Sequence, residues 1–268
     1  MKPPNPDPHG IPGDPGYVTL RDFRPALEAM LETESTYCLV GGLAVGQWAE
    51  ALLTPEERKR FEIPIRSKDI DIRASKSDAM MLVKNLNERG AVTQGIFKRV
   101  PKDGSKSFPS IAVSIKLPQS GGTYTSTTVE ALSGMPLLDV TGENGFILNR
   151  GTAMRYGKIS LLDPCSLLIC KLNAIRTRPP GQSDNDRTHA DILTLVIPRF
   201  IEKTLERMVT KKDDYHPYED SNRLAEILGK KVWSELIAED QKDRILSACQ
   251  KARDDMGVRG FKTGERSR

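Results

Sequence analysis

Cysteine and histidine are scarce in this 268-residue sequence. The cysteines are scattered without a Cys-x-x-Cys pair, at Cys38, Cys165, Cys170 and Cys249. A disulfide framework and a zinc site are therefore not expected. Histidine occurs only as His9, His189 and His216, which excludes histidine-rich metal chemistry. Any metal that the protein uses must be held by oxygen ligands.

Long hydrophobic runs are also missing. No apolar stretch approaches the length of about 20 residues that spans a bilayer, so no membrane partner is expected. The Pro- and Gly-rich stretch from Met1 to Gly16 lacks the apolar core of a secretory signal and predicts a flexible, partly polyproline tail. Hydrophobic residues make up 38% and charged residues 28% of the chain, as in ordinary globular proteins. These features favour a cytoplasmic protein.

The charge is mildly basic, with a formal net charge of +4. This balance permits a nucleotide or nucleic-acid partner without requiring one. Basic clusters occur at Lys211-Lys212, at Lys230-Lys231 and in the tail 258–268. The simplest interpretation is solvated helix faces, and an RNA-binding surface is the alternative.

The first 160 residues mix two periodicities. Helical spacing of apolar residues predicts helices over 20–33, 43–53 and 77–89. Alternation and short apolar runs predict strands over 37–40, 69–74, 92–100, 111–117 and 137–140. The Gly- and Thr/Ser-rich stretch that begins at Ser120 predicts a loop or weak hairpin. This order indicates an α/β or α+β fold, in which helices flank a mixed sheet.

From Asp163 onward the pattern is helical. An apolar helix is predicted over 164–175, with Pro164 in its first turn, and the next helix, 187–196, is expected to end before Pro198. Charged amphipathic helices are predicted over 200–209, 221–228 and 231–252. We therefore predict a tail over 1–16, a sheet domain over 17–160 and a helical C-terminal domain over 161–268.

Two aspartates alternate with isoleucines in the predicted strand 69–74. Because successive side chains on a strand point to opposite faces, Asp69 and Asp71 share one face while Ile70 and Ile72 point to the core. Two carboxylates held so close repel each other unless a cation lies between them, and Mg²⁺ prefers oxygen ligands. A solvated strand face with two surface acids is the alternative.

Gly41 and Gly42 stand between a predicted strand and a predicted helix. Glycines at such a turn allow a phosphate to approach the backbone, and the helix N-terminus supplies amides and a positive dipole. A tight turn alone is the alternative. The order strand, Gly-Gly, helix and Asp-x-Asp strand predicts a phosphate site beside a Mg²⁺ site.

These two motifs resemble the signature of the nucleotidyltransferase superfamily. The segments are YCLVGGLA, from Tyr37 to Ala44, and RSKDIDI, from Arg66 to Ile72. They are most similar to the AbiEii-type branch, the toxin components of certain toxin–antitoxin modules, which carries an R-x-T/S-x-D-I-D-L strand. LDPCSLLICKL, from Leu162 to Leu172, is similar to that branch's P-x-x-L-L-x-x-K-L helix. Arg176, Arg178 and the segment 189–195 then match its Arg-rich turn and its x-D-I-x-x-L helix.

The resemblance covers roughly residues 36 to 200 and implies a nucleotidyltransferase-like fold with the following site. Gly41 and Gly42 would hold nucleotide phosphates, and Asp69 and Asp71 would bind Mg²⁺. Ser67 and Lys68 flank the metal site and could touch phosphate oxygens. Lys171 would neutralise charge on the triphosphate, and Asp191 would orient that lysine or another group of the active site.

Three points depart from the family pattern. The spacing between Gly-Gly and Asp-x-Asp is long, and residues 54–64 look like an insertion. A third carboxylate is usual on a neighbouring strand, for which Asp139 is the best candidate, although it could be a turn residue. Asp184 and Asp186 compete with Asp191, and Asp186 could be only a helix N-cap.

Without the resemblance, Lys171 could simply complement a helix dipole or reach water.

The resemblance implies attack of an acceptor hydroxyl or phosphate on the α-phosphorus of a nucleoside triphosphate, with release of pyrophosphate. By similarity to the toxin branch, the acceptor is expected to be tRNA or other RNA, and the chain could have a cognate antitoxin. The alternative is a nucleotide- or partner-binding protein that keeps the fold without the chemistry. His189 is expected at the surface or a hinge, and Trp48 in the core.

Overall fold

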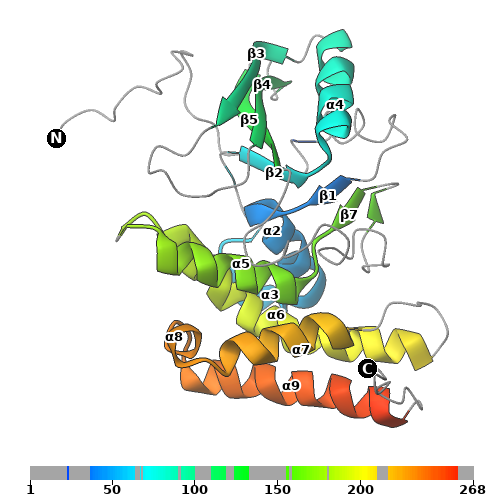
Figure 1. Ribbon diagram of the computed structural model, residues 1–268, viewed down its shortest axis with the longest axis vertical. Helices are drawn as coiled ribbons and strands as arrows, with labels where there is room; N and C mark the ends of the chain where they lie inside the picture. The colour runs from blue at the N-terminus through cyan, green and yellow to red at the C-terminus, as the bar shows by residue number, and fades with distance from the viewer. Residues whose placement is uncertain are drawn as a thin grey trace, which may run out of the picture. The chain divides into compact units, whose positions relative to one another are not determined.

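The computed structural model describes residues 23, 37–63, 67, 69–89, 92–99, 110–118, 124–132, 155–156, 159–179, 181–209 and 217–258. Over these ranges the protein has a mixed α/β architecture, as the sequence predicts (Figure 1). The predicted tail 1–16, helix 20–33 and strand 137–140 lie outside them, apart from Phe23, which is fully buried.

Two compact units make up the chain. The first takes its described residues from Met1–Ala44, Pro64–Met135 and Tyr156–Ser160, and the second from Val45–Ile63, Pro136–Arg155 and Leu161–Arg268. The domain boundary expected near residue 160 stays a prediction. None of the helices in the described ranges has the length and apolar character needed to cross a membrane.

The first unit is built on a mixed sheet of strand order β3-β4-β5-β2-β1-β7-β6. β2 pairs with β5 in parallel, whereas the pairs β1–β2, β3–β4 and β4–β5 are antiparallel. The strands are β1 (Tyr37–Leu39), β2 (Asp69–Arg73), β3 (Val92–Arg99), β4 (Ser110–Pro118), β5 (Tyr124–Leu132), β6 (Arg155–Tyr156) and β7 (Ile159–Leu161).

The sheet buries one apolar face. Ile70 and Ile72 of β2 are fully buried, as the alternation predicts. Helix α4 (Lys76–Glu88) contacts β3 and β4, and Ser75 caps it by accepting a hydrogen bond from the Asp78 amide at 3.1 Å (Figure 1). The hydroxyl of the buried Tyr37 donates to the Asp78 carbonyl at 3.0 Å, which ties β1 to the start of α4.

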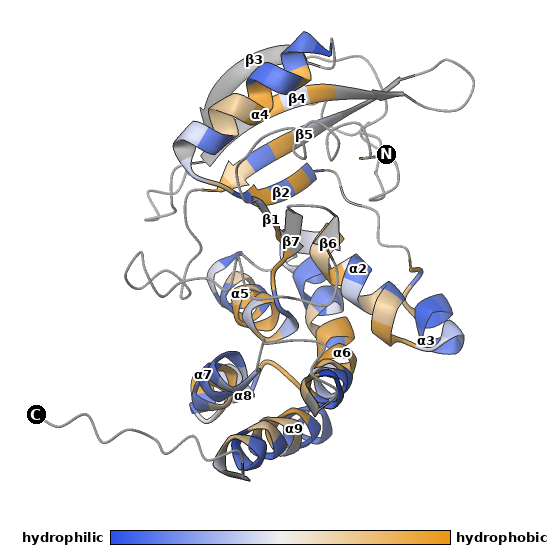
Figure 2. Ribbon diagram, turned by 90° about the vertical axis from the view of Figure 1, so that its right-hand side faces the viewer, coloured by the Kyte–Doolittle hydropathy of each residue, from blue (hydrophilic) through white to orange (hydrophobic). Residues whose placement is uncertain are grey.

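Helices form the second unit. They comprise the part of α2 (Gly41–Leu52) from Val45 onward, α3 (Pro55–Arg60), α5 (Pro164–Thr177), α6 (Asp184–Val209), α7 (Tyr218–Leu228), α8 (Lys231–Ser234) and α9 (Glu239–Val258). α6 packs against α5 and α9, and α7 packs against α9. α7 and α9 carry hydrophilic and hydrophobic residues together, as amphipathic helices do (Figure 2).

Trp48 anchors the core of the second unit, as expected. Its indole N–H donates to the Leu162 carbonyl at 2.8 Å, and its ring meets Phe200 edge to face at 5.1 Å. Both aromatic side chains are buried. The indole thus supplies a large apolar surface while its one polar group remains hydrogen-bonded.

Three local expectations need correction. β5 occupies the Thr/Ser-rich stretch that predicted a loop or weak hairpin. α6 continues through Pro198, which was expected to follow the end of a helix. The helix predicted over 231–252 is divided into α8 and α9 by residues 235–238.

Candidate functional site

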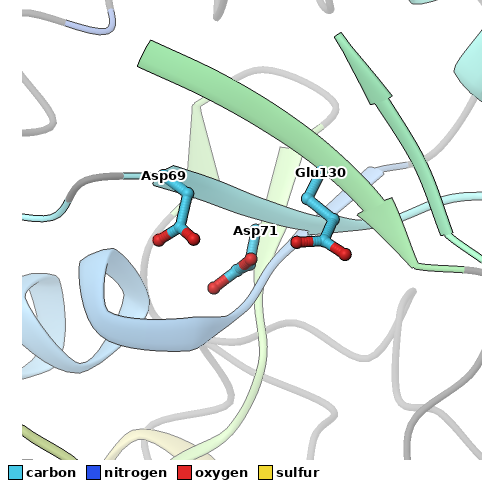
Figure 3. A group of neighbouring side chains, drawn as sticks. All are labelled: Asp69, Asp71 and Glu130. Carbon is cyan, nitrogen blue, oxygen red and sulfur yellow. The ribbon is translucent and has the colours of Figure 1, made fainter. Parts of the chain in front are cut away.

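Three carboxylates meet on the polar face of the sheet. Asp69 and Asp71 extend from β2, and Glu130 extends from β5 to the same side (Figure 3). The parallel register pairs Asp71 with Glu130 directly and Asp69 with Thr128. One carboxylate oxygen from each of the three residues lies within 4.8 Å of the other two, and all three residues are half-buried. The cluster therefore joins neighbouring strands that are distant in sequence.

A cation could lie among these three carboxylates. Three negative groups at such separation repel one another in a half-buried setting unless positive charge lies between them. Their donors are all hard oxygens, which suit Mg²⁺ or Ca²⁺ better than softer metals. The cluster of Asp69, Asp71 and Glu130 could thus bind a metal ion.

The Gly-Gly turn lies directly against this cluster. Gly41 has a φ of +67°, a conformation that glycine adopts without strain. A Cβ atom built on Gly41 would lie 2.1 Å from Oδ2 of Asp71, so only glycine fits there. The Val40 amide also donates to the Asp71 carbonyl at 2.9 Å. The turn is therefore held at the carboxylate, and α2 begins at Gly41 itself.

Residues that flank the carboxylates are described only in part. The Ser67 hydroxyl donates to Oδ1 of Asp69 at 3.3 Å, so Ser67 contacts a candidate metal ligand. Its predicted contact with phosphate remains a prediction. Lys68 and Asp139 lie outside the described residues, so their predicted roles stay predictions as well.

Lys171 lies in the second unit, on α5, and its partner is Asp186. Its ammonium donates to Oδ1 of Asp186 at 2.8 Å, and Arg178 donates to Oδ2 of the same carboxylate. Asp186 is only 2% exposed. Lys171 thus pairs with Asp186, one of the two residues that compete with Asp191, while Asp191 is exposed on α6. A catalytic role for Asp191 stays a prediction.

His189 adjoins this ion-pair cluster. Burial, reinforced by the charge of Lys171 and partly opposed by Asp186, lowers the pKa of His189 to about 3. The imidazole is therefore neutral at physiological pH. Its Nδ1 is buried and has no hydrogen-bond partner among the residues that the structure describes. His189 is half-buried in the structure, whereas a surface or hinge position was expected.

Glu130 was missed from the sequence, although a signal for it exists. Thr127, Val129 and Ala131 are buried, whereas Thr128 and Glu130 face the other side of β5. This alternation of small or β-branched residues with polar ones is typical of a strand with one buried face. Recognising it would have placed Glu130 on one face of a strand, although its pairing with β2 depends on the tertiary fold.

No protein-family model matches the chain, and no curated protein matches its sequence. The resemblance to the nucleotidyltransferase superfamily therefore stays a prediction from the sequence motifs.

Proposed function

We propose that the protein is a Mg²⁺-dependent nucleotidyltransferase that moves a nucleotide from a nucleoside triphosphate to an acceptor, with tRNA or other RNA as the acceptor class. The observation that carries the proposal is the three-carboxylate cluster at the Gly41 turn. Asp69 and Asp71 belong to the motif that resembles the superfamily. Glu130 would supply the third carboxylate that is usual in active members of the superfamily, a role for which Asp139 is the candidate from the sequence; the proximity of Glu130 to Asp69 and Asp71 supports this.

The residues fit a Mg²⁺ ion because all three donors are carboxylate oxygens close to one another. Asp69, Asp71 and Glu130 would hold it. When bound, such an ion offsets the negative charge of a triphosphate and stabilises the charge that develops during phosphoryl transfer. Removal of any one carboxylate should therefore weaken both metal binding and turnover.

The Gly-Gly turn would place the triphosphate. Gly41 and Gly42 form the first turn of α2, where backbone amides without helical partners favour an anion. A Cβ at Gly41 would occupy the space beside Asp71, so the glycine keeps the backbone close to the carboxylates. The proposal therefore places a phosphate group at the amides of this turn, next to the Asp71 carboxylate that packs on Gly41.

In the proposed reaction the acceptor hydroxyl gives up its proton to solvent water, and its oxygen forms a bond to the α-phosphorus. The bond from the α-phosphorus to the oxygen that bridges it to the β-phosphorus breaks, and pyrophosphate leaves. The chain's contribution is to hold the two reactants in line and to offset charge. We include Lys171 in this proposal on the ground of the resemblance alone, as a residue that would neutralise charge on the triphosphate.

The experiment incubates the protein with each α-labelled nucleoside triphosphate, Mg²⁺ and total tRNA, and measures label on the RNA. We expect the wild-type chain to transfer label to RNA. The transfer should disappear in Asp69→Ala, Asp71→Ala and Glu130→Gln, and it should persist in Glu88→Gln. Glu88 is a suitable control because it lies exposed on α4. Tight nucleotide binding without transfer to RNA, protein or small acceptors would instead favour a non-catalytic binding protein.

The toxin–antitoxin assignment is proposed from the resemblance alone and has its own test. Expression of the wild-type chain should arrest bacterial growth, and Asp69→Ala should abolish the arrest at equal protein level. Equal arrest by the wild type and by this variant would contradict the toxin proposal. Growth arrest without nucleotide transfer would separate toxicity from the enzymatic proposal.

A further inference from the structure

Asp186 binds two cations with its two carboxylate oxygens. The ammonium of Lys171 donates to Oδ1 at 2.8 Å, and the guanidinium of Arg178 donates to Oδ2. The side chain of Asp186 is 3% exposed, that of Lys171 is 14% exposed and that of Arg178 is 53% exposed. The carboxylate is thus a buried centre that joins an inner lysine to an outer arginine.

Within the part of the chain that the structure describes, the ion pairs of this cluster leave one positive charge in excess. One carboxylate faces two cations, and the neighbouring imidazole of His189 is neutral. A buried carboxylate needs only one cation to offset its charge, and Arg178 can provide that. Asp186 also lies in the first turn of α6, where the helix dipole favours a negative side chain. Asp186 thus has electrostatic partners besides Lys171.

We propose that Asp186 is a positioning residue for Lys171. Its Oδ1 holds the ammonium in one place, and Arg178 fixes the carboxylate through Oδ2. The inference rests on the proposed function only in one respect, that the held ammonium serves to neutralise a phosphate ligand. Asp186 itself contacts Lys171 and Arg178 and acts through the lysine.

The positioning role is tested first without nucleotide. The rate of acylation of Lys171 by a mild amine reagent is measured by peptide mass spectrometry, with Lys84, which is 74% exposed, as internal reference. Because the ammonium loses a charge-assisted hydrogen bond, Asp186→Asn should accelerate acylation of Lys171 by about tenfold. Asp191→Asn should leave that rate unchanged.

Asp186→Glu serves if Asp186→Asn does not fold. It keeps the negative charge but displaces the carboxylate, so a smaller acceleration at Lys171 is expected. Unchanged acylation of Lys171 in every folded Asp186 variant would overturn the proposal. Acceleration by Asp191→Asn equal to that of Asp186→Asn would also overturn it, because the exposed aspartate would then serve the lysine.

The second arm uses the transfer reaction. If Asp186 acts through Lys171, Asp186→Asn should raise KM for the nucleoside triphosphate about tenfold and change kcat less. The double variant that combines Asp186→Asn with Lys171→Met should have no higher KM than Lys171→Met alone. The single variant Lys171→Met leaves the Asp186–Arg178 pair intact. Additive losses would contradict action through the lysine.

The two arms separate the two proposals. A chain that transfers no nucleotide but shows the accelerated acylation retains the positioning role and loses the proposed function. A chain that transfers nucleotide, depends on Asp69 and Glu130, and shows unchanged Lys171 acylation retains the function and loses the positioning role.

Discussion

Gly41 and Asp71 occupy the same small space, because a Cβ atom on Gly41 would meet Oδ2 of Asp71 at 2.1 Å. The turn before α2 and the central carboxylate of the cluster are thus fitted to each other. The φ of +67° at Gly41 adds a second requirement for glycine. A substitution at this turn should therefore disturb the carboxylates directly.

Gly41→Ala should weaken both the fold and metal binding. The positive φ alone costs about 1–2 kcal/mol for a residue with a Cβ, and the contact with Asp71 adds to this cost. Gly181→Ala is a matched control, since Gly181 has a φ of +80° but a Cβ there would meet no atom of the described residues within 4 Å. Urea unfolding should show a larger loss for Gly41→Ala, and metal titration should show a loss for that variant alone. Equal effects of the two substitutions would show that Asp71 is not crowded.

Glu130→Gln should weaken metal binding by about tenfold or more, because a neutral amide replaces a charged ligand. Isothermal titration with Mg²⁺ or Mn²⁺ measures the loss, with Glu88→Gln as the unaffected control. The same titration of Asp139→Asn tests Asp139, the third ligand that was expected from the sequence. A large loss for Asp139→Asn and none for Glu130→Gln would return the third ligand to Asp139.

Acid should destabilise the second unit through His189. The pKa of His189 is about 3 in the folded chain, below the usual 6.5, chiefly because of burial. The unfolded chain therefore takes up a proton near pH 6.5 that the folded chain does not. As the pH is lowered from 6.5 to about 3, the free energy of unfolding should decrease by up to about 1.4 kcal/mol per pH unit. Above pH 6.5 the charge of His189 should make no contribution to the pH dependence. Urea unfolding of His189→Gln should show a flatter pH profile, and an unchanged profile would contradict this account.

Arg199 and Glu57 tie α6 to α3. Nη2 of Arg199 donates to Oε1 of Glu57 at 2.9 Å, and Nη1 donates to Oε2 and to the Leu52 carbonyl. The hydrogen bond from Arg199 is the largest cause that lowers the pKa of Glu57, to about 2. The stability from this pair is thus present above pH 4.5 and is lost as the pH falls towards 2.

Arg199→Lys should reduce the free energy of unfolding by about 1 kcal/mol at neutral pH, because lysine cannot replace the two-pronged contact. Lys251→Gln is the control, since Lys251 and Glu202 form an ion pair whose side chains are 61% and 57% exposed. Denaturant unfolding should show no measurable change for the control. A loss in Lys251→Gln as large as that in Arg199→Lys would remove the distinction between the two pairs.

The parts of the fold that local chemistry decides were predictable from the sequence. The alternation of aspartate and isoleucine predicted the two faces of β2. Pro164 likewise marked the first turn of α5. Each of these features depends on residues within a few positions of one another, so no knowledge of distant pairing was needed.

The parts that distant pairing decides were not predictable. The alternation in β5 is a local signal for a strand, but its pairing with β2 and β4 depends on distant residues. Glu130 joins the carboxylates only through this pairing. α6 continues past Pro198 with buried residues on both sides of the proline, Ile197 and Phe200, so burial outweighs the hydrogen bond that proline removes.

The most direct test of the central claim compares two labels in one reaction. The wild-type chain is incubated with Mg²⁺, RNA and nucleoside triphosphate labelled at either the α- or the γ-phosphate, beside Glu130→Gln. The account predicts that the wild-type chain transfers α-label to RNA and releases γ-label in pyrophosphate. Glu130→Gln should neither transfer α-label nor release labelled pyrophosphate. Transfer of γ-label, or undiminished α-label transfer by folded Glu130→Gln, would contradict it.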